Sequence, residues 1–392
     1  MLLYEFYVQG YKIEVWDTLV ENNLVSQWGE VTNGTHHLRP EMLVLLETAK
    51  PQDLRFRYLF IYESEESKQA CGIIYLQQLN FNHRNFNFEK KGILHYLALF
   101  ILKFTSFRVL LAGSLFAVDF SPISVKGNKP NRQTLLSILE GYSKLEKHDI
   151  FVLKDLPLEF DKTLLSNFGY NSFETDLTMQ LEINPSWKTF DDYEKALTHK
   201  YAQRVKKVRR QGSKLVRKQM NREDFLHHKV RLMDLFEQVA RKQTIRMGII
   251  DHVYFEEIFE TLGKDFIFIG YFQDEELIAF SSHICYAEKL EVHYIGIDYT
   301  KNKQFSLYFN ILYDGIILSM KHSKKSLELG RTAREAKAVV GCHPIYFNDY
   351  LKIRNKLTSW LLELLSKYFN KGLGEGWKKR HPFKTIATAI GG

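Results

Sequence analysis

A strand that leads directly into a charged turn and a helix is indicated by the stretch LELGRTAREAK, residues 327–337. Its first residues fit a short buried strand. Glu328 lies at the end of this strand, just ahead of Gly330, where a carboxylate can point into a crevice between the strand and the following helix. Thr332 and Glu335 have the spacing of a capping box, in which the two side chains satisfy the first amides of the helix.

Upstream of this stretch, one order of elements occurs twice along the chain. Alternating and apolar runs predict a hairpin, then a helix, then a short strand. In the first copy the predicted strands are 56–62, 71–79 and 150–153 and the predicted helix is 131–147; in the second copy the strands are 266–272, 277–286, 290–297 and 326–329 and the helix is 305–321. The first copy is longer by residues 82–107, which include an apolar helix near residues 89–105.

A boundary between the two copies is indicated near the middle of the chain. Residues 175–183 alternate as a half-buried strand does, and Asn184 and Pro185 follow at once. The repeat therefore predicts two similar α/β units, residues 1–183 and 184–392, each with a predominantly antiparallel central sheet.

Length and composition suit this division. The chain has 392 residues, of which 45% are hydrophobic and 26% are charged, and these values exclude a disordered or collagen-like chain. Cys71, Cys285 and Cys342 form no CxxC pair, so we expect neither a disulfide framework nor a thiolate zinc site. The longest apolar run, residues 93–102, is well short of the ~20 residues that a membrane-spanning helix needs. With no secretory leader seen, we expect a cytoplasmic protein, for which peripheral membrane contact stays open.

Positive charge is concentrated in one segment. Residues 199–218 contain nine basic residues and no acidic one, while the net charge of the whole chain is +8. Tyr201, Val205 and Val208 form a narrow apolar stripe, so the segment is predicted to be a helix with a wide basic face. Such a face is either a solvated linker or a surface for an anion, and the phosphates of CoA, tRNA and anionic lipid are the candidates.

Two stretches resemble the tandem acyltransferases built from two units of the GNAT fold, the group that includes Fem-type aminoacyltransferases and CelD/BioF-like acetyltransferase domains. The first is NPSWKTFDDY, residues 184–193, which leads into KYAQR, residues 200–204. The second is the opening stretch continued to Gly341 and Pro344, which is similar to the family's E-x-G-x(4)-E-x-K-x(3)-G-x-x-P signature. The resemblance covers most of the chain.

The resemblance implies an α/β (α+β) fold of two tandem GNAT-like units, each with a mixed, mostly antiparallel sheet flanked by helices. It implies acyl transfer from a thioester such as acyl-CoA to an amine or hydroxyl, in cell-envelope or polysaccharide biosynthesis, with no tightly bound cofactor. Two alternatives to this expectation stay open. One is a Fem-type enzyme that uses aminoacyl-tRNA as the donor, and the other is a degenerate, non-catalytic module that binds anions.

The sequence departs from single-unit GNAT enzymes at one important place. Those enzymes hold the CoA pyrophosphate with a Gly-rich loop after the fourth strand, at a helix N-terminus. Here that place reads DYTKNKQ, residues 298–304, and contains no glycine. Lys301 and Lys303 either replace the amide contacts by charge or belong to a solvated loop.

By resemblance, the site lies where strands 290–297 and 326–329 separate. Glu328 is our first candidate for the base or the amine-binding group, and an ion pair with a neighbouring Lys or Arg is its alternative explanation. His293 and Tyr294 are the other catalytic candidates, although strict alternation would place them on opposite faces of their strand. The candidates for donor or substrate binding are Arg331, Lys337, Glu335, Lys301, Lys303 and Arg204.

Several of these residues also have a purely structural explanation. Arg331 fits a surface arginine at a helix start, and Glu335 fits the capping box. His293 and His283 lie in apolar strands, where a histidine is more often a hydrogen-bonded core residue than a base. No third ligand accompanies these histidines at metal spacing, so we predict no metal.

Overall fold

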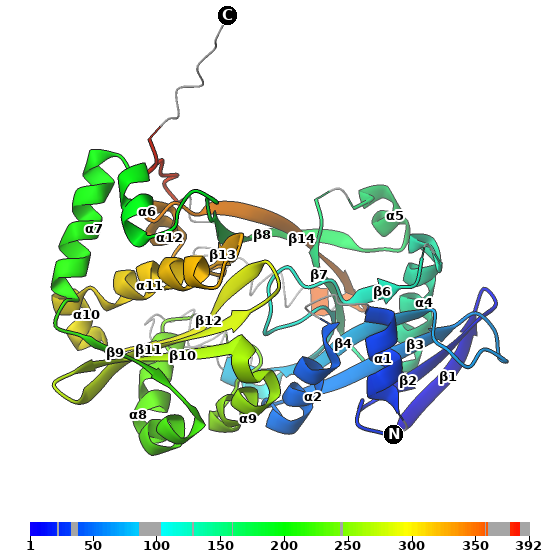
Figure 1. Cartoon of the computed structure of the whole chain (residues 1–392). Coiled ribbons are helices and arrows are strands. Elements are labelled where there is room, and N and C mark those ends of the chain that lie inside the picture. The colour runs from blue at the N-terminus through cyan, green and yellow to red at the C-terminus, as the bar shows by residue number, and fades with distance from the viewer. Residues whose placement is uncertain are drawn as a thin grey trace, which may run out of the picture. The chain divides into compact units, whose positions relative to one another are not determined.

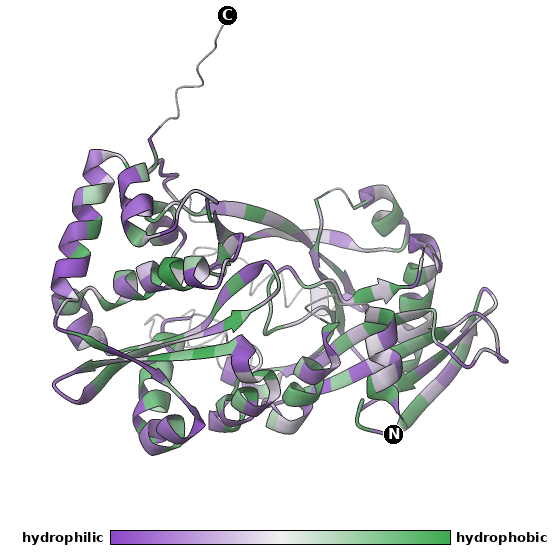
Figure 2. Cartoon of the chain, viewed as in Figure 1, coloured by the Kyte–Doolittle hydropathy of each residue, from purple (hydrophilic) through white to green (hydrophobic). Residues whose placement is uncertain are grey.

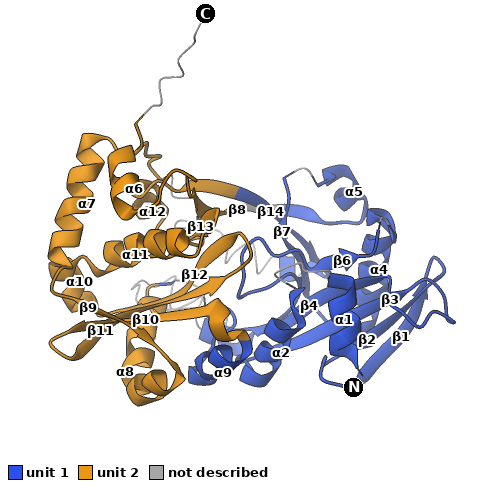
Figure 3. Ribbon diagram, in the orientation of Figure 1, with its two compact units in different colours: residues 1–176, 243–261, 346–375 blue, residues 177–242, 262–345, 376–392 orange. Residues whose placement is uncertain are grey.

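The computed structural model of the chain describes residues 1–21, 23–32, 38–85, 103–127, 129–158, 160–243, 246–356, 358–359 and 377–384 (Figure 1). Its Cα positions form two compact units (Figure 3). Unit 1 comprises residues 1–176, 243–261 and 346–375, and unit 2 comprises residues 177–242, 262–345 and 376–392. The predicted domains 1–183 and 184–392 are continuous along the chain and stay a prediction, whereas each compact unit is built from three segments.

The sheet of unit 2 has the strand order β8-β13-β12-β11-β10-β9. Its strands are β8 (Asn171–Glu182, in unit 2 from Leu177 onward), β9 (Val216–Met220), β10 (Phe266–Gln273), β11 (Glu276–Cys285), β12 (Lys289–Ile297) and β13 (Ser326–Glu328). Strands β12 and β13 are parallel, and every other neighbouring pair in this sheet is antiparallel.

Helices cover both faces of this sheet. Helix α11 packs its Leu312 and Ile316 against Leu290 and Leu327, while α8 packs Phe225 against Phe268 on the opposite face (Figure 1). The helices of unit 2 are α6 (Phe190–Ala196), α7 (His199–Gln211), α8 (Arg222–Ala240), α10 (Tyr299–Phe305), α11 (Leu307–Lys321) and α12 (Arg334–Val339). A short 3-10 helix, η3 (Gly263–Asp265), precedes β10.

Unit 1 repeats this plan with a different chain path. Its strand order is β1-β2-β3-β4-β5-β7-β14, with β6 paired to β4. The strands are β1 (Leu2–Val8), β2 (Tyr11–Trp16), β3 (Leu54–Tyr62), β4 (Gly72–Phe81), β5 (Phe107–Ala112), β6 (Ile123–Val125), β7 (Ile150–Leu156) and β14 (His343–Ile353, in unit 1 from Tyr346 onward). The helices are α1 (Leu24–Thr32), α2 (Pro40–Ala49), η2 (His83–Asn85), α4 (Arg132–Leu145), α5 (Lys162–Asn167) and α9 (His252–Leu262).

The two sheets share one topology, which confirms the predicted fold class. In each unit antiparallel strands are followed by one parallel pair, β5 with β7 or β12 with β13, and then by an antiparallel strand, β14 or β8. Strand β5 is the counterpart of β12 and begins at Phe107, so the first copy also has a third strand. The predicted apolar helix near residues 89–105 lies largely outside the described residues.

The three cysteines, Cys71, Cys285 and Cys342, are buried and form no disulfide bond in this structure. Among the helices in the described ranges, none combines the length and the apolar character needed to cross a bilayer.

Candidate functional site

The end of the parallel strand pair in unit 2 brings two carboxylates together. Strands β12 and β13 are in register from Lys289 opposite Ser326 to Glu291 opposite Glu328. Strand β13 ends there, whereas β12 continues to Ile297. Because residues in register on parallel strands lie on the same face, Glu291 and Glu328 are neighbours at the point where the strands part.

Glu328 is almost completely buried, with 1% of its surface exposed, and it is held from two sides. Its Oε2 accepts a hydrogen bond from Lys289 Nζ at 2.5 Å, and its Oε1 accepts one from Thr178 Oγ1 at 3.2 Å. The ion pair considered as the alternative explanation is therefore present. A carboxylate at this depth needs such a partner, because burial penalises an unpaired charge.

Glu291 is the site residue to which the sequence analysis gave no role. It is buried, its Oε2 accepts a hydrogen bond from the Tyr286 hydroxyl at 3.1 Å, and its Oε1 lies 3.1 Å from His293 Nδ1. In the tautomer that donates from Nδ1, the other ring nitrogen of His293 carries the lone pair that can accept a proton. The available signal was the spacing of Glu291 and His293 at i and i+2 on one strand.

His293 and Tyr294 lie together rather than on opposite faces. The register between β11 and β12 shifts between Ser281 and His283, where two steps on β11 face three on β12. This irregularity breaks the alternation expected from the sequence, and the rings of His293 and Tyr294 approach to 4.3 Å between centroids. Burial raises the pKa of Tyr294, so its phenol stays protonated at neutral pH and can donate a hydrogen bond.

Lys337 is a buried lysine on α12. Its Nζ donates a hydrogen bond to the carbonyl oxygen of Gly330 at 3.1 Å, and only 4% of its surface is exposed. Burial lowers the pKa of Lys337 to about 7, although the nearby Cys342 and Glu328 favour the charged form. Near neutral pH this amine therefore exists in both protonation states and is able to exchange a proton.

The predicted capping box between Thr332 and Glu335 is wrong. Helix α12 begins at Arg334, and its N-cap is Ala333, which has a φ of 52° and no capping side chain. The left-handed turn at Ala333 moves the helix start one residue beyond Thr332, so the hydroxyl is not in the capping position. The carboxylate of Glu335 instead pairs with Arg380. Arg331 is half-buried in this turn, and a donor-binding role for these residues stays a prediction.

Lys301 and Lys303 lie on helix α10 and not in the loop that the sequence suggested, and Lys303 is exposed on it, so a donor-binding role for these two lysines stays a prediction. Asp298 is its N-cap and accepts a hydrogen bond from the amide of Thr300 at 3.0 Å. Arg231 Nη2 donates to the other oxygen of Asp298 at 2.7 Å. At the place where the resemblance expects a phosphate loop, a carboxylate thus occupies one of the free amides of the helix, that of Thr300.

The basic segment forms α7 and the start of β9, and part of its charge is compensated within unit 2. Arg209 and Arg217 both pair with Asp314, and the guanidinium of Arg204 lies 4.5 Å from the ring centroid of Phe309. Lys206 pairs with Glu194 and Lys218 with Asp224. Four exposed cations show no hydrogen bond or ion pair within the described residues: Lys200, Lys207, Arg210 and Lys214. In Figure 2 most of the α7 ribbon has the purple colour of hydrophilic residues.

His283 is a hydrogen-bonded residue of the core, which is the structural explanation given for it above. It is fully buried, is in register with Val292, and has its Nε2 2.9 Å from Ser281 Oγ. Burial lowers the pKa of His283 to about 3, so the ring is neutral. Among the described residues, no group of three His, Cys, Asp or Glu side chains is placed to hold a metal.

Comparison with known proteins identifies the fold. No family model and no curated protein matches the sequence. Among solved structures, the chain is similar to a tandem GNAT protein from the clavulanic acid biosynthesis pathway, with a TM-score of 0.52 and 9% identity over 87% of this chain and 98% of that one. It is also similar to FemX, with a TM-score of 0.50 and 12% identity over 81% of this chain and 92% of that one. The chain therefore has a tandem GNAT fold, as the resemblance in its sequence implies.

Proposed function

We propose that unit 2 is an acyltransferase that moves an acyl group from a thioester or ester donor to an amine or hydroxyl. One observation carries this proposal: the buried carboxylates Glu291 and Glu328 lie side by side at the point where the parallel strands β12 and β13 part. In a tandem GNAT fold, this point is where the resemblance places the chemistry.

The residues around the carboxylate pair supply the groups that acyl transfer needs. The acceptor must lose a proton as it attacks the acyl carbon, and the leaving group must gain one as its bond to that carbon breaks. His293, oriented by Glu291, and Lys337, with its lowered pKa, are the proposed proton acceptors. Tyr294 is the proposed proton donor to the leaving group, and Glu328 is the proposed holder of the attacking amine.

A second candidate function differs from the first in the donor of the acyl group. Asp298 caps α10, and its carboxylate already accepts a hydrogen bond from the amide of Thr300, so this amide is not free to bind a CoA pyrophosphate. The exposed cations of α7 instead favour a longer polyanion. Both observations support aminoacyl-tRNA as the donor, as in a Fem-type enzyme, over the acyl-CoA first expected from the sequence.

Titration of the full chain with each donor tests the proposal. Acetyl-CoA is titrated by calorimetry, and charged tRNA is titrated by fluorescence anisotropy at several salt concentrations. Saturable acetyl-CoA binding supports the thioester donor, and tRNA binding with a steep log–log salt slope supports the ester donor. Binding of neither donor contradicts the acyltransferase proposal and leaves the degenerate anion-binding module.

A further inference from the structure

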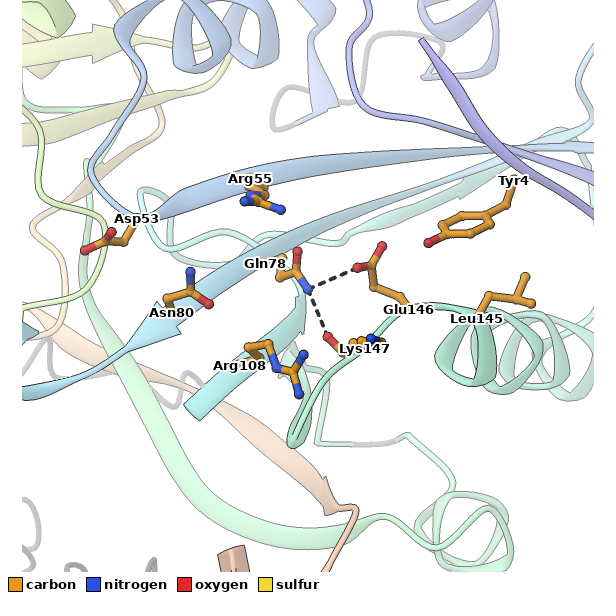
Figure 4. A pocket seen from close by; sticks show the side chains of 9 residues that line it. All are labelled: Tyr4, Asp53, Arg55, Gln78, Asn80, Arg108, Leu145, Glu146 and Lys147. Atoms are coloured by element: carbon orange, nitrogen blue, oxygen red, sulfur yellow. Dashed lines mark hydrogen bonds between the residues drawn. The ribbon is translucent and has the colours of Figure 1, made fainter. Parts of the chain in front are cut away.

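Unit 1 contains a polar pocket of about 330 Å³ that no step of the proposed reaction uses (Figure 4). Its lining includes the cationic side chains Arg55, Arg108 and Lys147. These residues come from the start of β3, the start of β5 and the segment between α4 and β7. Cations from three separate parts of the chain therefore meet at one cavity.

The strand register sets the positions of these side chains. Arg55 on β3 is in register with Gln78 on β4, and Asn80 on β4 is in register with Arg108 on β5. Partners on antiparallel strands share a face, so these four side chains lie on one face of the sheet. Helix α4 covers the same face further along and ends at Leu145, and the pocket opens where the helix stops.

The floor of the pocket is a buried and fully paired polar network. Glu146 accepts hydrogen bonds from Arg57 Nε at 3.1 Å, from the Tyr142 hydroxyl at 3.0 Å and from Gln78 Nε2 at 3.2 Å. Gln78 Nε2 also donates to the carbonyl oxygen of Lys147 at 3.1 Å. The charge of Glu146 is thus neutralised by Arg57, and the hydrogen bonds hold the floor of the pocket in one arrangement before a ligand binds.

The cations above this floor are only weakly compensated. Arg55 and Lys147 are exposed and show no hydrogen bond or ion pair from their side chains to any described residue. Arg108 Nε lies 3.6 Å from Asp149, a distance that leaves most of its hydrogen-bonding capacity unused. The lining contains two carboxylates, Glu146 and Asp53, and Glu146 is already paired with Arg57. The three cations of the lining are therefore opposed only by the charge of Asp53 within that lining.

We propose that this pocket binds the phosphate group of a small organic phosphomonoester. Arginine forks and a lysine suit a compact dianion, and the cavity is larger than a bare phosphate, which leaves room for an organic body. The pocket lies at the starting ends of β5 and β7, whereas Glu328 lies at the final end of β13 in unit 2. The pocket is therefore not the counterpart in unit 1 of the carboxylate site in unit 2. The inference does not depend on the proposed acyl transfer.

Calorimetric titration of the full chain with glycerol 3-phosphate tests this inference, with glycerol as the uncharged control. Saturable heat is expected for the phosphate ester and none for glycerol. The double variant Arg55→Gln with Lys147→Gln should weaken the affinity at least about tenfold, because charge-assisted hydrogen bonds are lost. Its melting temperature should be unchanged, since both side chains are exposed.

A matched double variant, Lys144→Gln with Lys162→Gln, removes two exposed charges from unit 1 outside the pocket and should keep the affinity within about twofold. An equal loss in this control would overturn the inference in favour of general electrostatic attraction. The absence of saturable heat with glycerol 3-phosphate, or unchanged binding in the Arg55 and Lys147 variant, would also overturn it.

Discussion

Glu328, Glu291, His293 and Lys337 are ionisable residues buried within one unit, and burial makes such a group of residues costly. Each has a polar partner in the described structure, so none is an isolated charge in the core. A core that needed only stability would use apolar side chains at these positions, since a buried ion pair is often no more stable than its apolar replacement. The presence of Glu291, His293 and Glu328 where β12 and β13 part, with Lys337 on the following helix α12, is typical of a functional site.

Glu328→Gln tests the residue at the centre of this group. The amide keeps the shape but has one accepting oxygen in place of two. That oxygen can still accept from Lys289 while the NH2 group donates to the Thr178 hydroxyl oxygen, so the fold should survive with a loss of about 1–3 kcal/mol. If the carboxylate holds the amine or moves its proton, turnover should fall ~10²–10⁴-fold. Steady-state acyl transfer and thermal melting of the purified variant measure the two effects separately.

Glu182→Gln is the matched control, because Glu182 is an exposed carboxylate on the neighbouring β8 and loses the same charge. It should keep full turnover. Normal turnover in Glu328→Gln would remove this residue from the site. A loss of turnover no larger than the loss of folded protein would reduce its role to the ion pair with Lys289.

Lys337 predicts a dependence of stability on pH. Its pKa in the folded chain is about 7, against 10.5 for an ordinary lysine, so between these values the unfolded chain binds a proton that the folded chain does not. The free energy of unfolding should therefore rise with pH through this window, by up to about 1.4 kcal/mol per pH unit. Lys337→Met removes this contribution and should be more stable than the wild type below the window.

Urea unfolding of both proteins from about pH 6 to about pH 9 measures this difference. The wild type should gain stability relative to Lys337→Met as the pH rises above neutrality. Lys264→Met, at an exposed lysine, should leave the curve of the wild type unchanged. Parallel curves for the wild type and Lys337→Met would show that the buried amine titrates at an ordinary pKa.

At the scale of elements, α7 is held by a few inward contacts and presents the rest of its charge to solvent. Val205 and Val208 are buried, and Arg209 pairs with Asp314 on α11. Arg204 adds a contact with the ring of Phe309 on α11, whereas Lys207 and Arg210 show no hydrogen bond or ion pair from their side chains within the described residues. Charge reversal at these three positions should therefore leave the helix folded, at the cost of the Arg204 contact, and mainly change what it binds.

Reversal of Arg204, Lys207 and Arg210 to Glu should weaken tRNA binding strongly and flatten its salt dependence. Each lost phosphate contact reduces the log–log slope by about 0.7–0.9. Anisotropy titrations of tRNA over a range of salt concentrations measure both quantities. Reversal of three exposed lysines outside α7 serves as control for net charge: Lys144, Lys162 and Lys264. If both triple variants bind tRNA as the wild type does, α7 is a solvated helix.

At the scale of the whole molecule, neither compact unit is a continuous piece of chain. Strand β7 of unit 1 pairs with β14, which lies near the C-terminal end of the sequence. Strand β13 of unit 2 pairs with β8, whose first residues belong to unit 1. A cut between residues 183 and 184 therefore leaves each sheet without one of its own strands.

Expression of residues 1–183 and 184–392 as separate chains tests how far the units depend on each other's segments. Loss of β14 exposes the edge of β7, and loss of β8 leaves β13 with one neighbour in place of two. We expect neither fragment to unfold cooperatively alone. Thermal melting followed by circular dichroism compares each fragment with the full chain. A sharp transition in an isolated fragment would show that its segment of the chain is a domain in its own right.

The sequence by itself determined the elements and their repetition. The strands around 266–297, the helix before β13 and the basic helix α7 were all predictable, because their periodicity and turns are local properties of the chain. The signature around Glu328 also placed this residue at a strand end, where the structure has it. The tandem plan could be read because both copies keep the same order of elements.

Only the tertiary structure decided how these elements form a site. Glu328 meets Lys289 and Thr178, which lie 39 and 150 residues away along the chain, and periodicity carries no information on such partners. The contact of His293 with Tyr294 depends on an irregularity between two strands, and the start of α12 depends on a left-handed residue at Ala333. The pairing of β13 with β8 and of β7 with β14 also joins strands that are far apart along the chain. Pairing between distant strands is selected by packing of the whole sheet, and no local stretch of sequence encodes it.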